Sequence, residues 1–253
     1  LLIFVLCLLA EFSLYQRLAK RSVKAPVTNR WYALGRFLIY AFLLFTCMRS
    51  GYGRAALNPS MAYFSEVNFN NHAAVNTYWA LMKDYFKTKQ KNPYTFFSDA
   101  EVQQELATVF YEEPGRSPQI LTTQRPNVVL VILESYIADL VASLGGEPGI
   151  APKMEELIKQ GLLFNNVYAA SDRSDKGMVG ILSAFPAQGP ESIIKHIDKH
   201  ENLPAMGQEL DSLGYVNSFY HGGQSEFYNF KSYMLSHGVE RIVDNSDFGF
   251  DQQ

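Results

Sequence analysis

The sequence predicts an α/β domain with a mainly parallel sheet and helices on both faces, preceded by transmembrane helices and a helical linker. After residue 125, short runs rich in Val, Ile and Leu alternate with helix-length segments, as in folds built from βαβ units. Before residue 60, a basic stretch separates two long apolar segments, as in membrane proteins. We therefore divide the chain into residues 1–60, 61–124 and 125–253.

Residues 1–60 are predicted to cross the cytoplasmic membrane more than once. Leu1 to Leu9 is continuously apolar and fits the tail of a helix that begins before the first residue given; Trp31 to Met48 forms a second apolar segment. The stretch between them contains basic residues and no acid: Arg17, Lys20, Arg21, Lys24 and Arg30. The positive-inside rule places this loop in the cytoplasm and the residues after Arg49 on the outer, periplasmic side. A buried helical hairpin in a soluble domain is the alternative.

Residues 61–124 are predicted to form a helical linker close to the membrane. Apolar residues recur at helical spacing from Ala62 to Phe86, which indicates one or two helices. Ser98 is a suitable N-cap residue for a further helix, which is expected to run to about Tyr111. A polar connector that contains proline follows.

Residues 125–253 are predicted to form the α/β domain. The expected strands are Asn127–Leu133, Leu162–Tyr168, Tyr215–Tyr220 and Arg241–Val243. The expected helices are Ser135–Leu144, Pro152–Gln160, Ser174–Leu182, Leu203–Leu213 and Phe227–Ser236. The first strand is almost wholly aliphatic, which is typical of a strand buried on both faces.

The composition excludes several classes of protein. A net charge of −3 gives no reason to expect a nucleic-acid partner. The two cysteines, Cys7 and Cys47, lie in apolar runs, which makes a disulfide framework improbable. The sequence has no CxxC and no HExxH motif.

Two residues 40 positions apart form the predicted catalytic pair. Glu134 ends the first strand, at the edge where parallel sheets place their chemistry, and is predicted to bind a metal ion. Ser174 begins a helix and is predicted to be a nucleophile whose hydroxyl the metal activates. Arg173 and Lys176 would neutralise a phosphate, although Lys176 could point away on the helix. The alternative is that Ser174 is a helix cap and Glu134 a turn residue.

Other polar residues have weaker patterns. His221 follows a strand and faces the expected cleft, where it would contact substrate or serve as a structural histidine in a turn. Asp172 and Asp175 would either assist the metal or favour the helix start electrostatically. Three histidines near helix ends are expected to face solvent: His196, His200 and His237.

Three blocks of sequence carry a resemblance to a known family. These are Asn127 to Tyr136, Ser171 to Gly177 and Leu182 to Gln188, which resemble the lipoteichoic acid synthase-like, sulfatase-fold membrane transferases, closest to their Gram-negative branch. The resemblance implies an extracytoplasmic alkaline-phosphatase-like domain and a divalent metal, Mn²⁺ first and Mg²⁺ or Zn²⁺ as alternatives. It also implies transfer of a phosphoglycerol-type group from a phospholipid to an envelope glycan or lipid acceptor, through a covalent Ser or Thr intermediate.

The resemblance assigns roles to particular residues. Glu134 matches the family's glutamate metal ligand, and Ser174 matches its nucleophilic threonine. Ser171 stands where the family has Gly. Tyr228, a predicted substrate contact, begins Tyr228-Asn229-Phe230, where the Gram-positive enzymes have Trp-Asn-Arg; the phosphate-binding arginine is therefore absent from that position. The family's remaining metal ligands, an Asp-His pair, and a further substrate histidine lie downstream of residue 253, so this stretch is expected to hold an incomplete, inactive metal site.

Two other functions fit the same fold. One is a phosphoethanolamine transferase or phosphodiesterase, and the other is a sensor or scaffold that has lost catalysis. Sulfate ester hydrolysis is disfavoured, because Ser174 is followed by Asp175-Lys176-Gly177 and not by the x-Pro-x-Arg of the sulfatase signature.

Overall fold

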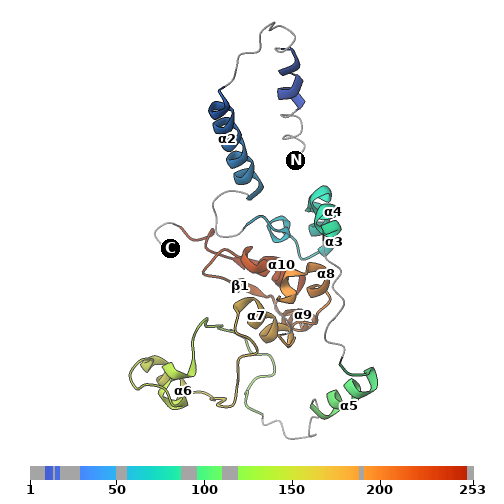
Figure 1. Cartoon of the computed structure of the whole chain (residues 1–253). Helices are drawn as coiled ribbons and strands as arrows, with labels where there is room; N and C mark the ends of the chain where they lie inside the picture. The colour runs from blue at the N-terminus through green and yellow to red at the C-terminus, as the bar shows by residue number, and fades with distance from the viewer. Residues whose placement is uncertain are drawn as a thin grey trace. The chain divides into compact units, whose positions relative to one another are not determined.

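The computed structural model describes residues 9–13, 15–17, 29–49, 56–86, 96–109, 119–187 and 191–249 (Figure 1). The chain divides into two compact units, Leu1–Asn58 and Pro59–Gln253. The predicted apolar segment Leu1–Leu9 lies, apart from Leu9, outside the described residues. So does most of the basic stretch that follows it.

The first unit contains the helix α2, Arg30–Arg49, which matches the second predicted apolar segment. Its first turn is capped by Asn29, whose Oδ1 accepts a 3.1 Å hydrogen bond from the Trp31 N–H. Within the described residues, α2 is the one helix long and apolar enough to cross a membrane, with a mean hydropathy of 1.5. Length and composition alone support that assignment, and a signal sequence would satisfy the same criteria.

The second unit begins with the residues predicted as a linker. They form a 3₁₀ turn η1 (Pro59–Ala62) and the helices α3 (Asn68–Ala74), α4 (Thr77–Phe86) and α5 (Asp99–Val109). The helices predicted within 62–86 and after Ser98 are therefore present. The start of α5 is a reciprocal cap, because the Ser98 backbone N–H donates to Glu101 Oε2 at 2.8 Å and the Glu101 N–H donates to Ser98 Oγ at 3.4 Å.

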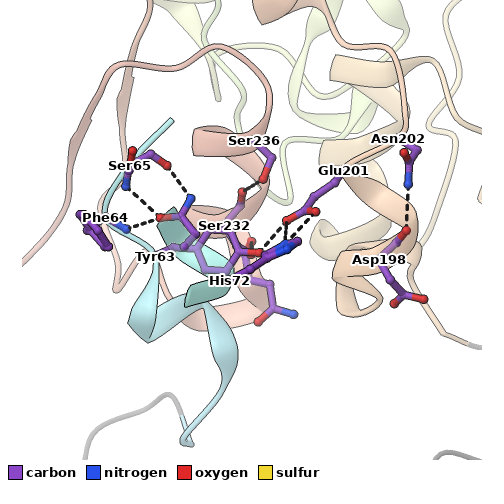
Figure 2. A network of polar contacts seen from close by, with 11 residues as sticks. Tyr63, Phe64, Ser65, His72, Asp198, Glu201, Asn202, Ser232 and Ser236 are labelled. Carbon is purple, nitrogen blue, oxygen red and sulfur yellow. Dashed lines mark hydrogen bonds and ion pairs between the residues drawn. The ribbon is translucent and has the colours of Figure 1, made fainter. Parts of the chain in front are cut away.

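The segment 59–74 packs on α10 (Phe230–Ser236) through η1, and it contacts Glu201, the residue that follows α8 (Ile197–His200). Figure 2 shows the polar contacts, in which the Glu201 carboxylate meets the Tyr63 hydroxyl at 2.6 Å and His72 Nε2 at 3.0 Å. The Ser232 N–H at the start of α10 donates to Ser60 Oγ at 2.9 Å. Residues 59–74 are thus part of the packed domain.

A two-stranded parallel sheet lies at the centre of this unit. β1 (Ser218–Tyr220) pairs in register with β2 (Arg241–Val243), with Phe219 opposite Ile242. The 3₁₀ turn η5 (Phe227–Asn229) and α10 connect the two strands, which gives the βαβ arrangement that the sequence predicts. β2 has the predicted bounds, whereas β1 is the last half of the predicted strand.

Helices pack around this βαβ unit (Figure 1). They are α7 (Ser174–Ser183), η4 (Ile193–Lys195), α8 and α9 (Met206–Ser212), and contacts join α7 to α9 and to η4, and η4 to α8 and η5. The buried apolar core consists of Val179, Ile194, Phe230, Tyr233, Met234 and Val239. The start of α9 fits closely against the end of α10, because a Cβ on Gly207 would lie 2.3 Å from the His237 carbonyl oxygen.

Two predicted strands are not formed. Among the described residues, neither Asn127–Leu133 nor Leu162–Tyr168 pairs with another strand, and both segments run as irregular chain. Val129 and Tyr168 are each 85% exposed. A strand buried on both faces requires hydrogen-bonded neighbouring strands, and neither segment has one among the described residues. The first segment is held at its start, where the Tyr215 hydroxyl donates to the Pro126 carbonyl at 3.0 Å.

The region after the first of these segments is less regular than predicted. The expected helix Ser135–Leu144 is two 3₁₀ turns, η2 (Ala138–Leu140) and η3 (Ala142–Leu144), because Val141 between them has an extended backbone. Gly145, at φ 92°, ends the second turn. The helix α6 (Pro152–Ile158) begins at the predicted proline, and the Glu155 carboxylate accepts hydrogen bonds from Ser143.

Candidate active site

Ser174 and Glu134 are in direct contact. The Ser174 hydroxyl donates a hydrogen bond to Glu134 Oε1 at 2.7 Å, across 40 positions of sequence. Glu134 lies at the end of the aliphatic segment, and Ser135 after it has a φ of 57°, which is strained for a residue with a side chain. The structure therefore brings together the predicted nucleophile and the predicted metal ligand.

Ser174 is the first residue of α7. The N-cap position belongs to Arg173, whose carbonyl accepts from the Lys176 and Gly177 N–H groups at 3.1 and 2.8 Å. The alternative reading of Ser174 as the helix cap is therefore wrong, and its hydroxyl points to Glu134. The first N–H groups of a helix and its dipole favour an anion, so negative charge that develops near Ser174 is stabilised.

Arg173 contacts both Asp175 and Tyr228. Its Nε lies 3.2 Å from Asp175 Oδ1, and its Nη2 donates to Asp175 Oδ2 at 3.4 Å. Its Cζ lies 5.8 Å from the centre of the Tyr228 ring, which is cation–π distance. Two of the predicted substrate residues, Arg173 and Tyr228, are therefore neighbours.

Lys176 lies one turn into α7. Its side chain is 13% exposed, and its Nζ is 4.0 Å from Asp172 Oδ1. Asp172 lies before α7 and is largely exposed, and an ion pair of this length with an exposed partner is worth a few tenths of a kcal/mol, about 0.3. Asp172 is therefore an ion-pair partner of Lys176.

Tyr228 and Asn229 interrupt the helical chain before α10. Both have positive φ, 57° and 62°, which costs roughly 1 kcal/mol or more for each residue and therefore requires supporting contacts. Asn229 is buried, and its Nδ2 donates to the Ile194 carbonyl at 3.2 Å. Tyr228 is thereby presented from a fixed backbone.

His221 lies among aromatic rings. It stacks on Phe219 at 5.7 Å and meets Phe230 edge-on at 5.5 Å, and Phe230 in turn contacts the Tyr228 ring at 6.0 Å. The first residue of α10 thus links the predicted substrate residues His221 and Tyr228.

Two histidines expected to face solvent are buried. His200 is 0% exposed and His237 is 2% exposed, and their rings lie 5.6 and 4.2 Å from that of Tyr233. Burial, together with the neighbouring His237, lowers the pKa of His200 to about 3, against a smaller opposing effect of Asp198. The prediction was wrong because His200 and His237 flank short helices in polar sequence, while the aromatic partner that buries them is remote from His200 in the chain.

Glu134 and Ser174 fit part of a site for a hard divalent cation. Neighbouring oxygen ligands around Mg²⁺ are roughly 3 Å apart, given metal–oxygen distances of about 2.1 Å, and the two oxygens here are separated by 2.7 Å. Within the described residues there is no group of three His, Cys, Asp or Glu side chains that could hold a metal. The pair thus supplies two ligands, and further ligands are needed.

An apolar hollow of about 400 Å³ lies between residues 133–140 and α6, and neither Glu134 nor Ser174 lines it. Leu133 and Tyr136, which flank Glu134 and Ser135 in sequence, form part of its wall, and α6 contributes Pro152, Met154 and Leu157. Hydrocarbon fits such a wall better than a polar group does.

A carboxylate and a helix-start hydroxyl are in contact here, on an α/β domain with a parallel βαβ unit. The sulfatase family pattern matches residues 126–252, half of the chain, and the chain belongs to that family. A solved structure described as a protein in the alkaline phosphatase superfamily, from Vibrio parahaemolyticus, is 28% identical with a TM-score of 0.42. The match covers 44% of this chain and 27% of that one, so the chain spans about a quarter of its relative's length.

Family membership establishes the coarse part of the resemblance. The chain carries a sulfatase-superfamily domain, which supports an enzyme of that superfamily, and members of the superfamily use divalent metals. The lipoteichoic acid synthase-like branch and the substrates that it implies belong to the proposal below.

Proposed function

We propose that this protein is a membrane-anchored, metal-dependent phosphotransferase of the lipoteichoic acid synthase-like type. It takes a phosphoglycerol-type group from a phospholipid and passes it to an envelope glycan or lipid acceptor. The group is carried on Ser174 between the two steps. The observation that carries the proposal is the 2.7 Å hydrogen bond between Ser174 Oγ and Glu134 Oε1.

In the first step Ser174 Oγ attacks the phosphorus of the lipid phosphodiester. A bond forms between Oγ and phosphorus, and the bond between phosphorus and the diacylglycerol oxygen breaks. The hydroxyl proton lies toward Glu134 Oε1 before attack, and it leaves on the diacylglycerol oxygen. Arg173 and the start of α7 stabilise the negative charge of the phosphoryl oxygens.

In the second step a hydroxyl of the acceptor attacks the same phosphorus. The bond from Ser174 Oγ to phosphorus breaks, and the acceptor's proton restores the serine hydroxyl. Glu134 and Ser174, with further ligands, would hold a divalent cation, which when bound would supply Lewis acidity at the serine hydroxyl. The carboxylate and the hydroxyl are already in contact, which reduces the reorganisation needed for attack.

A phospholipid donor is supported by the surroundings of the pair. The apolar hollow between residues 133–140 and α6, whose lining includes Leu133 just before Glu134 in sequence, would accommodate part of an acyl chain. The residues after Ser174 lack the x-Pro-x-Arg sequence of sulfate ester hydrolases. Both features favour phosphoryl transfer from a lipid over sulfate hydrolysis.

The membrane arrangement is part of the proposal. In it α2 crosses the cytoplasmic membrane as one of several helices, and residues 59–253 lie on the periplasmic side. An alkaline phosphatase reporter fused after Asn58 is expected to be active, and one fused before Arg30 inactive. The reverse pattern would overturn the proposed topology.

The covalent intermediate gives the direct test. The full-length protein is incubated with Mn²⁺ and phosphatidylglycerol labelled in its headgroup, and the adduct is located by mass spectrometry. A glycerophosphate mass on Ser174 is expected, together with release of diacylglycerol. Labelled phosphatidylethanolamine in a parallel sample tests the phosphoethanolamine transferase alternative.

Two variants make the result specific. Ser174→Ala is expected to abolish the adduct and turnover, whereas Ser212→Ala, which removes an exposed hydroxyl from α9, leaves both unchanged. Normal lipid turnover by Ser174→Ala would refute the mechanism. Absence of an adduct and of turnover with every donor would favour a sensor or scaffold.

A further inference from the structure

Asp175 follows the nucleophile in sequence, yet its carboxylate faces the protein interior. The Asp175 side chain is 1% exposed, whereas the Glu134 and Ser174 side chains are more open. An outward carboxylate at this position would repel a phosphate that approaches Ser174. The fold turns the charge inward.

The buried carboxylate is paired with Arg173. Nη2 donates a hydrogen bond to Oδ2 at 3.4 Å, and Nε lies at ion-pair distance from Oδ1, 3.2 Å. Oδ1 is buried and accepts no hydrogen bond from the described residues, so its charge is balanced by the guanidinium alone. Burying a carboxylate is costly unless it is paired, so this contact is strongly favoured in the folded chain. Arg173 therefore supplies the positive charge that makes the burial of Asp175 tolerable.

The Asp175 backbone is fixed as well. Its carbonyl oxygen accepts a 2.8 Å hydrogen bond from the buried hydroxyl of Ser192, which lies 17 positions away. Because Asp175 is in the first turn of α7, its position relative to Ser174 is set by the helix. Because the Asp175 backbone is held in place, the Asp175 carboxylate can orient the Arg173 guanidinium.

Arg173 has a second neighbour, and some of its N–H donors remain available. The Tyr228 ring, presented from the left-handed Tyr228-Asn229 pair, lies 5.8 Å from the guanidinium carbon. A guanidinium carries five N–H donors, of which the Asp175 contacts occupy about two. The Arg173 side chain is 41% exposed, so the remaining donors are accessible to a ligand.

We propose that Asp175 is a positioning residue for phosphate binding. It holds the Arg173 guanidinium by an ion pair, and the Tyr228 ring provides a second contact to the same group. The free N–H groups of Arg173 then bind the oxygens of the phosphoryl group at Ser174. The ligand class is a phosphodiester or phosphate anion, and the inference rests on the function proposed above.

The test measures anion binding separately from turnover. Inorganic phosphate is titrated into the full-length protein by calorimetry, and its inhibition constant is measured in the lipid assay. Asp175→Asn is expected to weaken phosphate binding roughly tenfold and to raise KM by a similar factor, since a charge-assisted contact is lost. Asp211→Asn, the same substitution on an exposed residue of α9, leaves both values at those of the wild type.

A double-variant cycle separates positioning from a merely structural effect. Arg173→Lys keeps the charge but loses the planar guanidinium group, and it is also expected to weaken phosphate binding about tenfold. The double variant is expected to be no worse than Arg173→Lys alone, because both changes act through one guanidinium. Additive effects, or wild-type phosphate binding by Asp175→Asn, would overturn the inference.

Two further outcomes have defined meanings. If Asp175→Asn does not fold, Arg173→Lys decides, and wild-type phosphate binding by that variant overturns the inference. If the wild type binds phosphate but transfers nothing from any lipid, the proposed function fails. Weaker phosphate binding by Asp175→Asn would in that case still establish the positioning role.

Discussion

The Tyr63 hydroxyl donates a 2.6 Å hydrogen bond to Glu201 Oε1, joining residues 138 positions apart in the sequence (Figure 2). His72 Nε2 approaches the same carboxylate at 3.0 Å. Burial, with the Glu201 carboxylate adding to it, raises the pKa of Tyr63 well above its usual range, so the hydroxyl stays a donor. The residues between the apolar helix and the sulfatase domain are therefore anchored to that domain by a buried tyrosine.

Tyr63→Phe is predicted to loosen this anchor. The change keeps the ring and removes a donor to a largely buried carboxylate, which costs about 1–2 kcal/mol of unfolding free energy. Denaturant unfolding of the protein measures the loss. Tyr78→Phe removes the hydroxyl of a tyrosine that is 73% exposed and should change stability by less than about 0.5 kcal/mol. Equal losses in the two variants would contradict this role for Glu201.

His200 is predicted to make the domain sensitive to acid. Its folded-state pKa of about 3 lies below its ordinary value of 6.5, so the unfolded chain binds the proton first as the pH falls. The stabilising effect of the neutral, buried ring is therefore complete above about pH 6.5 and is lost progressively toward pH 3. Between pH 7.5 and 5.5 this site should cost about 1 kcal/mol of unfolding free energy.

The matching variant is His200→Phe. Phenylalanine retains ring contacts with Tyr233 and His237 and cannot be protonated, so the part of the acid loss due to this site should disappear. His196→Gln, at a partly exposed histidine beside Glu191, should keep it. Denaturant unfolding curves at pH 7.5 and 5.5 measure the loss of unfolding free energy in acid. An unchanged loss in His200→Phe would show that another group is responsible.

The sequence predicted best what depends on local chemistry. Pro152 begins α6 and Gly145 ends η3, as the backbone preferences of proline and glycine favour. Ser174 begins α7, at the residue where the sequence predicted that a helix begins. The contact between Glu134 and Ser174 was predicted from a strand end meeting a helix start. The contact is present although Asn127–Leu133 is not paired as a strand and Glu134 lies in a turn.

Features that depend on distant partners were not predictable in the same way. Asn127–Leu133 has a strand's composition, but a strand exists only when another strand hydrogen-bonds to it. The burial of His200 follows from Tyr233, 33 positions later, and the left-handed Tyr228-Asn229 pair depends on Ile194. Residue types do not encode such pairings individually. The sequence assigned Asp175 to the metal or to the electrostatics of the helix start, and its burial against Arg173 was not predicted.

Phe230 is predicted to support both the core and the substrate residues. It is 3% exposed and touches the rings of His221 and Tyr228, so Phe230→Ala should cost about 3–5 kcal/mol of unfolding free energy. Thermal unfolding measures the cost. Phe227→Ala, at the neighbouring phenylalanine that is 38% exposed, should cost clearly less. A small effect at Phe230 would mean that the core cluster relaxes around the cavity.

Metal dependence gives the sharpest test of Glu134. Dialysis of the full-length protein against EDTA is predicted to abolish lipid turnover, and Mn²⁺ to restore it, because the Ser174 hydroxyl is otherwise a poor nucleophile. Glu134→Gln keeps the size of the side chain but removes the anionic ligand, so half-maximal activation should require at least about tenfold more Mn²⁺. Glu147→Gln, at an exposed carboxylate in the same region, should titrate like the wild type. If Glu134→Gln lost activity but bound Mn²⁺ with unchanged affinity, the carboxylate would act on the Ser174 proton alone, as a general base and not as a metal ligand.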